Sequence, residues 1–344
     1  SLSTVDLKVQ DDLTVTDDAS VGGDLAVTGA LDVDGATTTD GITNAGNFST
    51  DGGTIKLDGN YPTGTGNVAL GDTALDTVEA GGTYNTAIGH NAATAITTGD
   101  NNTSIGALTL DALSTGEGNT GIGYGALSGA TTSSYNTAVG EYAGVSITTG
   151  ASNVAIGRAA LYANTTASNN TAVGSSALNA NTTGGNNVAM GIQALDANTT
   201  GDENIGIGSN ALGANTTADN NTAVGGGALA SNTTASNNTA VGRSALAANT
   251  TGANNHAFGA NALDAVTTGS HNIGIGKDAG GAITTANENT AVGHNALAVT
   301  TTGANNVAIG SSALDANTTA SNNTAVGTSS LGANTTGTAN TGLG

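Results

Sequence analysis

Asparagine is the polar residue with the most regular spacing in this chain of 344 residues. One asparagine recurs every 17 residues from Asn85 to Asn340, and a glycine follows each of them four places later. A side-chain amide donates and accepts hydrogen bonds, so amides stacked in register form ladders in parallel β-structure. The predicted structural ladder includes Asn85, Asn102, Asn136, Asn170, Asn204 and Asn238, with the glycines Gly89, Gly106, Gly140, Gly174, Gly208 and Gly242.

Tyrosine is the candidate for surface binding, because an exposed ring can stack on sugars or on protein partners. Five of the six tyrosines fall between residues 84 and 162. The competing interpretation, which we favour from the sequence, is that they fill space near one end of the repeat region. The five residues are Tyr84, Tyr124, Tyr135, Tyr142 and Tyr162.

The remaining reactive side chains predict no active site. The four histidines, His90, His256, His271 and His294, lie at scattered repeat positions, so they do not stack into one site within a chain. A ring of three identical histidines around a trimer axis is the alternative, although solvated surface positions fit better. The N-terminal aspartates lack a calcium-loop motif, and carboxylates in the repeats are scattered singly. We therefore expect no enzymatic activity, no cofactor and no metal.

The composition excludes several classes of protein. Glycine contributes 54 residues, aromatic residues 2% and charged residues 9%, which leaves material only for a thin, extended core. The chain has no cysteine, so disulfides do not stabilise it. A net charge of −21 disfavours nucleic acid as a partner, and no apolar run approaches the length of a membrane span.

Two kinds of repeat position these residues. Residues 1–59 read as hexads such as DLTVTD and DLAVTG, in which two alternating apolar residues precede a turn, as in a short β-strand of a fibre shaft. Residues 60–84 form a junction that holds a first imperfect coil, NVALG, 18 rather than 17 residues before Gly89. Residues 85–344 form a rod of sixteen 17-residue repeats.

The consensus of the long repeat is N-T-A-(V/I)-G-x-x-A-L-x-A-N-T-T-G-x-N, numbered here from its asparagine as position 1. Position 4 is always large and apolar, position 3 is Ala, Ser or Gly, and positions 8 and 9 are nearly always Ala-Leu. The pattern predicts one coil of an all-β parallel β-solenoid, with two short strands that each point one large residue inward. The glycine at position 5 is expected where φ is positive or where a neighbouring chain's backbone comes close.

The thin core favours more than one chain. Ordering 17 residues costs on the order of 25 kcal/mol, which requires about 1,000 Å² of apolar burial per coil. One Val or Ile, one Leu and a few Ala supply less. We therefore expect the Ala-rich face to pack against sister chains, and a homotrimer is the natural closed arrangement.

The coil NTAVG-xx-AL-x-ANTTG-xN resembles the NSVAIG-type head repeats of trimeric autotransporter adhesins. It is more similar still to the NTAIG-xx-AL-xx-NTTG-xN repeats of bacteriophage tail-fibre and other virion-fibre proteins. The resemblance covers about residues 67–344 and implies a left-handed β-roll, three chains wide, with the Val/Ile positions inward. The adhesin coils are shorter. The sequence stops in mid-motif at Gly344, before any C-terminal intramolecular chaperone of the kind found in related phage fibres, so we expect either that such a segment was cleaved off or that this is part of a longer fibre.

Three functional hypotheses follow. The first is a virion tail or capsid fibre that presents a host-attachment tip and has other fibre proteins and a host-surface glycan or protein as partners. The second is a trimeric adhesin or extracellular fibre of a bacterial surface. The third is an ice-binding solenoid, because stacked Thr-Thr pairs would present rows of hydroxyls. The expected location is the virion surface or the extracellular space.

Overall fold

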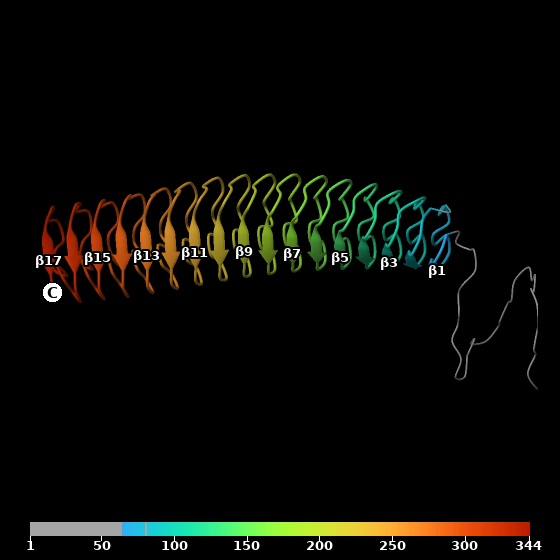
Figure 1. Cartoon of the computed structure of the whole chain (residues 1–344). Helices are drawn as coiled ribbons and strands as arrows, with labels where there is room; N and C mark the ends of the chain where they lie inside the picture. Colours follow the sequence, from blue (N-terminus) through green and yellow to red (C-terminus); the bar gives the residue numbers. More distant parts are fainter. Residues whose placement is uncertain (1–63, 80) are drawn as a thin grey trace, which may run out of the picture. The chain divides into compact units, whose positions relative to one another are not determined.

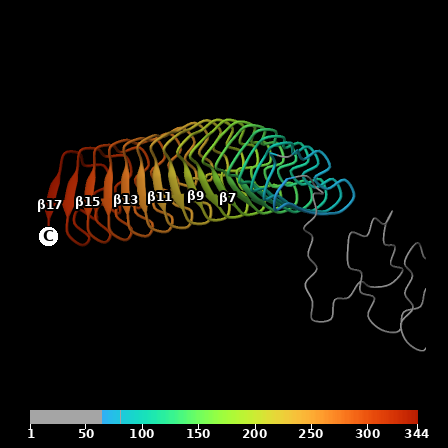
Figure 2. The same cartoon turned by 45° about the vertical axis from the view of Figure 1, so that its right-hand side comes forward.

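The computed structural model describes residues 64–79 and 81–344, and every regular element in these ranges is a β-strand. One three-residue strand per coil joins a single parallel sheet, and successive coils lie side by side along a rod (Figures 1 and 2). The strands are β1 (Val68–Leu70), β2 (Thr86–Ile88), β3 (Thr103–Ile105), β4 (Thr120–Ile122), β5 (Thr137–Val139), β6 (Val154–Ile156), β7 (Thr171–Val173), β8 (Val188–Met190), β9 (Ile205–Ile207), β10 (Thr222–Val224), β11 (Thr239–Val241), β12 (His256–Phe258), β13 (Ile273–Ile275), β14 (Thr290–Val292), β15 (Val307–Ile309), β16 (Thr324–Val326) and β17 (Thr341–Leu343).

The predicted fold class, an all-β parallel solenoid with 17-residue coils, is confirmed. Each strand pairs in register with the next, as Thr171 in β7 pairs with Val188 in β8. At the start of the rod Val68 pairs with Thr86, so the 18-residue step is absorbed outside the strands and NVALG is the first coil of the same sheet. The predicted hexad shaft at residues 1–59 lies outside the described residues.

The strands are turned the opposite way from the prediction. Position 4 was expected to point inward, but Ile156 in β6 is 38% exposed while its neighbour Ala155 is 1% exposed. The reason is space. A Cβ added to Gly274, which stands at position 3 of its coil, would lie 2.7 Å from Cγ of Leu263 at position 9 of the preceding coil. The interior at position 3 therefore has room only for a small side chain.

The Ala-Leu segment is a turn, which corrects the prediction of a second strand in each coil. Leu178 has a φ of 49°, in the left-handed region that no strand uses, and its side chain is completely buried. Ala177 beside it is also completely buried, as is Ala172 at position 3. The Ala-rich face is thus covered within one chain, and the expectation that it packs against sister chains is wrong.

The glycine at position 5 has the positive φ expected from the sequence, and another part of the backbone comes close to it. Gly174 has a φ of 137°, and a Cβ added to it would lie 2.4 Å from the carbonyl oxygen of Gly191. The backbone that approaches so closely belongs to the next coil of the same chain, rather than to a neighbouring chain. Glycine at this position therefore sets the distance between successive coils.

Candidate functional site

The asparagines at position 1 form a continuous ladder inside the rod. The backbone N–H of Asn187 donates to Oδ1 of Asn170 at 2.9 Å, and Nδ2 of Asn170 donates to the carbonyl of Gly184 at 2.9 Å. Both asparagine side chains are completely buried. The ladder thus satisfies buried polar groups along the sheet, and its amides are inaccessible to a ligand.

A second asparagine ladder, at position 12, was missed in the sequence. In the central coils Nδ2 of Asn198 donates to Oδ1 of Asn181 at 2.8 Å and to the carbonyl of Gly201 at 3.0 Å. The ladder ends at Asn249, whose Oδ1 is buried without a partner because position 12 of the next coil is Val266. The recurrent Asn of the ANTT motif was the available signal.

Threonine at position 13 adds a hydroxyl ladder on the same turn. The hydroxyl of Thr182 donates to the carbonyl of Thr199 at 3.0 Å. Position 13 makes the equivalent bond to the next coil in the coils between that of Thr97 and that of Thr318. The threonine at position 14 is exposed in every complete coil, as at Thr183. The first hydroxyl of each pair is therefore structural, and the second faces solvent.

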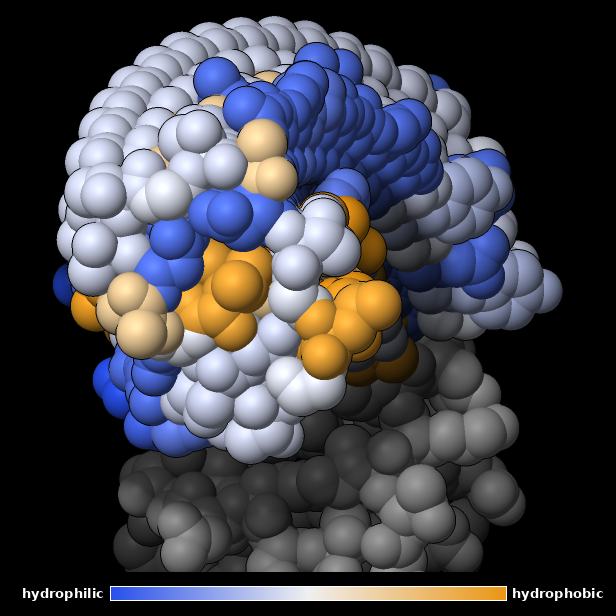
Figure 3. Space-filling model, turned by 90° about the vertical axis from the view of Figure 1, so that its left-hand side faces the viewer, coloured by the Kyte–Doolittle hydropathy of each residue, from blue (hydrophilic) through white to orange (hydrophobic). Residues whose placement is uncertain are grey.

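An apolar stripe follows the outer face of the sheet from end to end. It consists of the last residue of each strand, so its members are adjacent in register along the rod. Viewed from the C-terminal end, hydrophobic side chains line up in depth along one side (Figure 3). The stripe comprises Leu70, Ile88, Ile105, Ile122, Val139, Ile156, Val173, Met190, Ile207, Val224, Val241, Phe258, Ile275, Val292, Ile309, Val326 and Leu343.

The stripe residues are exposed or half-buried in the single chain. The exposed fractions are 37% for Ile88, 43% for Met190, 42% for Phe258 and 41% for Ile309. The largest exposed apolar patch of a typical monomeric protein covers about 300–600 Å², and such a patch is often a binding site. Seventeen aligned large apolar residues therefore mark this face as the main candidate interaction surface.

Three of the five predicted tyrosines come together as a tyrosine cluster, defined here as Tyr124, Tyr142 and Tyr162. The rings of Tyr124 and Tyr142 meet edge to face at 5.3 Å between centroids, and those of Tyr142 and Tyr162 at 6.5 Å. Their exposed fractions are 46%, 37% and 44%. The pKa of the Tyr142 hydroxyl is raised, chiefly because partial loss of solvation disfavours its charged form and further by the neighbouring Tyr124 hydroxyl.

Tyr84 and Tyr135 occupy a different place in the coil, directly before the ladder asparagine. A Cβ added to Gly118 would lie 2.8 Å from Cδ1 of Tyr135, so the Tyr135 ring rests on the preceding coil. The Tyr84 ring covers Gly66 in the same way. The Tyr135 hydroxyl donates to the Glu117 carboxylate, which raises the pKa of Tyr135. These two tyrosines are 61% and 58% exposed, and neither joins the tyrosine cluster.

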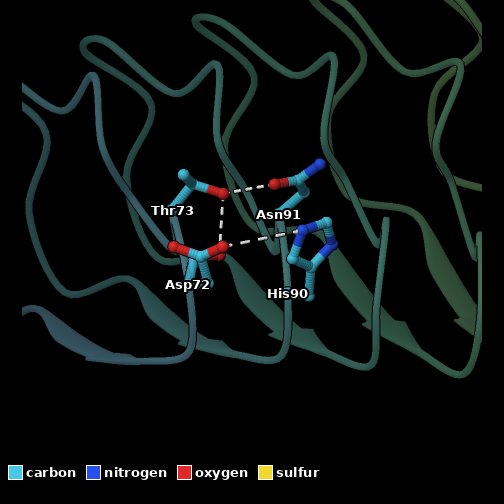
Figure 4. Close-up of polar contacts among 4 residues, drawn as sticks. All are labelled: Asp72, Thr73, His90 and Asn91. Carbon is cyan, nitrogen blue, oxygen red and sulfur yellow. Dashed lines mark hydrogen bonds and ion pairs between the residues drawn. The ribbon is translucent and has the colours of Figure 1, made fainter.

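The polar side chains of the first two coils form an exposed network (Figure 4). Nε2 of His90 lies 3.8 Å from Oδ2 of Asp72, and the Thr73 hydroxyl donates to Oδ1 of Asn91. The His90 and Asp72 side chains are 59% and 81% exposed, so the pair is solvated. His90 shares position 6 with His294, contrary to the scattered positions inferred from the sequence, but the two lie near opposite ends of the rod.

Carboxylates stand at several positions of the described coils. Burial raises the pKa of Asp111, Asp196 and Asp264, which share position 10 in separate coils. Lys277 binds Asp278 at 2.7 Å and lowers the pKa of that carboxyl group. Within the ranges that the structure covers, no group of three or more His, Cys, Asp or Glu could hold a metal ion.

The described coils contain no helix that could cross a membrane. Comparison with known proteins found no matching family model, no matching curated sequence and no matching solved structure.

Proposed function

We propose that this chain is the rod of a homotrimeric fibre of a virion, a tail or capsid fibre that spaces and presents a host-attachment tip. The observation that carries the proposal is the apolar stripe. One chain buries the small residue at position 3 and the leucine at position 9, and it leaves the large apolar residue at position 4 on the outer face of the sheet. Such a surface is expected to be covered by further copies of the same face.

The size of the stripe supports a stable association. Seventeen large apolar residues, many about two-fifths exposed, together offer on the order of 1,000 Å². A standard stable interface buries about 800 Å² on each partner. Because the stripe spans every strand, association would hold the copies together over the whole length of the rod.

The hydrogen-bond ladders suit a spacer. Backbone bonds between coils continue outside the strands, for example from Ser176 N–H to the Arg158 carbonyl at 3.0 Å and from Leu178 N–H to the Ala194 carbonyl at 3.0 Å. With strands about 4.8 Å apart, seventeen strands extend about 80 Å. A rod bonded around its perimeter resists bending and keeps its two ends at a fixed distance.

The virion and bacterial-surface alternatives differ in location and partners. In a virion, the rod would join other fibre proteins and face a glycan or protein of the host surface; in an adhesin, it would extend from a bacterial envelope. Immunogold electron microscopy of the source culture, with antibody against the purified rod, separates them. We expect label on thin fibres of virus particles. Label confined to bacterial envelopes would contradict the virion assignment and favour the adhesin.

Ice binding remains a second candidate because of one observation, the unbroken exposed row of threonines at position 14. A regular hydroxyl array on a rigid solenoid is the surface that such a function requires. The neighbouring hydroxyl at position 13 is already bonded to the next coil, as in Thr182, which leaves a single row. Thermal hysteresis of the purified protein tests this candidate, and its absence at millimolar concentration would remove it.

A further inference from the structure

We propose that the tyrosine cluster is a binding site for a neutral oligosaccharide, which packs its sugar rings against Tyr124, Tyr142 and Tyr162. The inference rests on the proposed function, because a host-attachment fibre requires a ligand on a cell surface. It adds a site and a ligand class to that function.

The cluster is a local departure from the repeat. Its three residues stand at positions 6, 7 and 10 of three successive coils, and no other coil has an aromatic residue at these positions. The two edge-to-face contacts, at 5.3 and 6.5 Å, join the rings into one exposed aromatic surface. A repeat that folds without these rings elsewhere does not require them for folding here.

The place of Tyr142 in its coil also indicates a role beyond folding. Its φ is 56°, in the left-handed region that is unusual for a bulky residue. At the same position Ser176 adopts a φ of 57° with a smaller side chain. A Cβ added to Gly125 would lie 3.0 Å from Cδ1 of Tyr142, so glycine in the preceding coil leaves the room in which the ring lies. Leu108 has the same φ of 56° at this position, so the backbone conformation belongs to the repeat. The fitted place on the preceding coil is what presents this ring for contact with a partner.

The chemistry of the surroundings favours a sugar. Tyrosine rings offer an apolar face to the C–H groups of a pyranose and a hydroxyl to its polar edge. Glu141 and Arg158 follow Tyr124 at position 6 of the next two coils and supply charged hydrogen-bonding groups in the same row. The net charge of −21 disfavours phosphorylated or acidic chains, whereas a neutral saccharide meets no repulsion.

The test is isothermal titration calorimetry of the full chain with maltohexaose, cellohexaose, mannohexaose and chitohexaose. The four probes separate α- from β-linked chains and plain from N-acetylated sugars, which distinguishes different surface glycans. Because the chain has no tryptophan, tyrosine fluorescence reports contact with the rings directly. We expect at least one of these hexasaccharides to bind and to change that fluorescence.

The matched variants take their residues from another coil of this chain. Tyr124→Ser, Tyr142→Ser and Tyr162→Asn together reproduce Ser175, Ser176 and Asn179 of the next coil, so the variant keeps side chains that the repeat accepts. The control combines Tyr84→Asn and Tyr135→Asn, which reproduce Asn169 at their own position.

Each lost ring is expected to weaken binding by about 2- to 10-fold, so the triple variant should lose at least about 10-fold, while the control variant stays within about 2-fold of the native chain. Absence of binding to all four probes at millimolar concentration would overturn the inference, as would unchanged affinity of the triple variant. A trimeric mass retained in either case would show that only the saccharide site has failed, and that the fibre proposal stands.

Discussion

The two faces of each strand differ in a way that is unusual for a small β-structure. The inner face carries alanine, serine or glycine, and the outer face carries valine, isoleucine or a larger apolar residue. In β6, Ala155 is 1% exposed and Ile156 is 38% exposed. The inner face is therefore completed by one chain, and the outer face is built for something that the single chain does not contain.

The largest effect is expected from enlarging the inner face. Ala172→Leu introduces a large side chain where Ala172 is completely buried and only a small side chain fits, so we expect a loss of about 3 kcal/mol or more in the free energy of unfolding. Denaturant unfolding at matched protein concentration measures it. Thr171→Val, the residue that the chain itself uses at Val154 and Val188, is the control and should unfold like the native chain. If Ala172→Leu unfolds with the same free energy as the native chain, the claim that the interior has no room for a large side chain is wrong.

Charged substitutions in the apolar stripe on the outer face should weaken the association of subunits. Val173→Asp together with Val224→Asp places carboxylates in the apolar stripe, where burial between copies would cost several kcal/mol. We expect the subunits to dissociate at least about 100-fold more readily, as measured by sedimentation at decreasing concentration. Val173→Ile with Val224→Ile, which matches Ile156, should leave the mass unchanged. An aspartate variant that keeps the native mass throughout would show that the stripe is not the interface.

A smaller effect is expected inside the second asparagine ladder. Asn215 donates to Asn198 at 2.8 Å and accepts from Asn232 at 3.0 Å, so Asn215→Ala leaves a buried amide oxygen unpaired and should cost about 1–3 kcal/mol of unfolding free energy. Asn249→Ala is the matched control. Its Nδ2 donates to Oδ1 of Asn232 at 3.0 Å, so this variant also leaves one amide oxygen unpaired. Oδ1 of Asn249 accepts no bond, however, so one ladder bond fewer is lost and the cost should be smaller. Equal losses for the two variants in denaturant unfolding would contradict a cooperative ladder.

The smallest effect concerns the pH dependence at Asp111. Burial raises the pKa of this carboxyl group above 3.8, and its Oδ1 has no hydrogen-bond partner. The folded chain therefore binds more protons than the unfolded chain just above pH 3.8, and stability falls as the pH rises through the raised pKa. Asp111→Asn should remove this fall and gain less than about 0.5 kcal/mol at pH 7, since the group is partly solvated. An unchanged slope of thermal stability against pH would contradict the assignment.

The sequence predicts the repeat architecture because register is a property of spacing. The 17-residue period aligned Asn170 with Asn187. The single 18-residue step predicted the boundary between shaft and rod, but β1 pairs with β2 in the same sheet across it. The direction of the strand was mispredicted because three residues with period 2 fit either orientation, and size suggested that Val173 should be inside. What reverses it is Leu178, which fills the interior from a turn with positive φ, a conformation that its residue type does not indicate.

The tyrosine cluster is likewise a feature that the sequence predicts only in part. The sequence identifies Tyr124, Tyr142 and Tyr162 as candidates, but they stand at different positions of three coils. Only the path of the turn after each strand brings their rings together and leaves Tyr84 and Tyr135 elsewhere. The second asparagine ladder was hidden for a different reason, since position 12 is apolar in the first four complete coils and becomes asparagine only from Asn164. The four apolar residues are Ile96, Leu113, Ala130 and Ile147.

Sedimentation equilibrium of the native chain tests the central claim most directly, because the uncovered outer face must be explained by association. A homotrimer predicts a mass of about three times 32.6 kDa, maintained at micromolar concentration. A stable monomer of 32.6 kDa under the same conditions would contradict it.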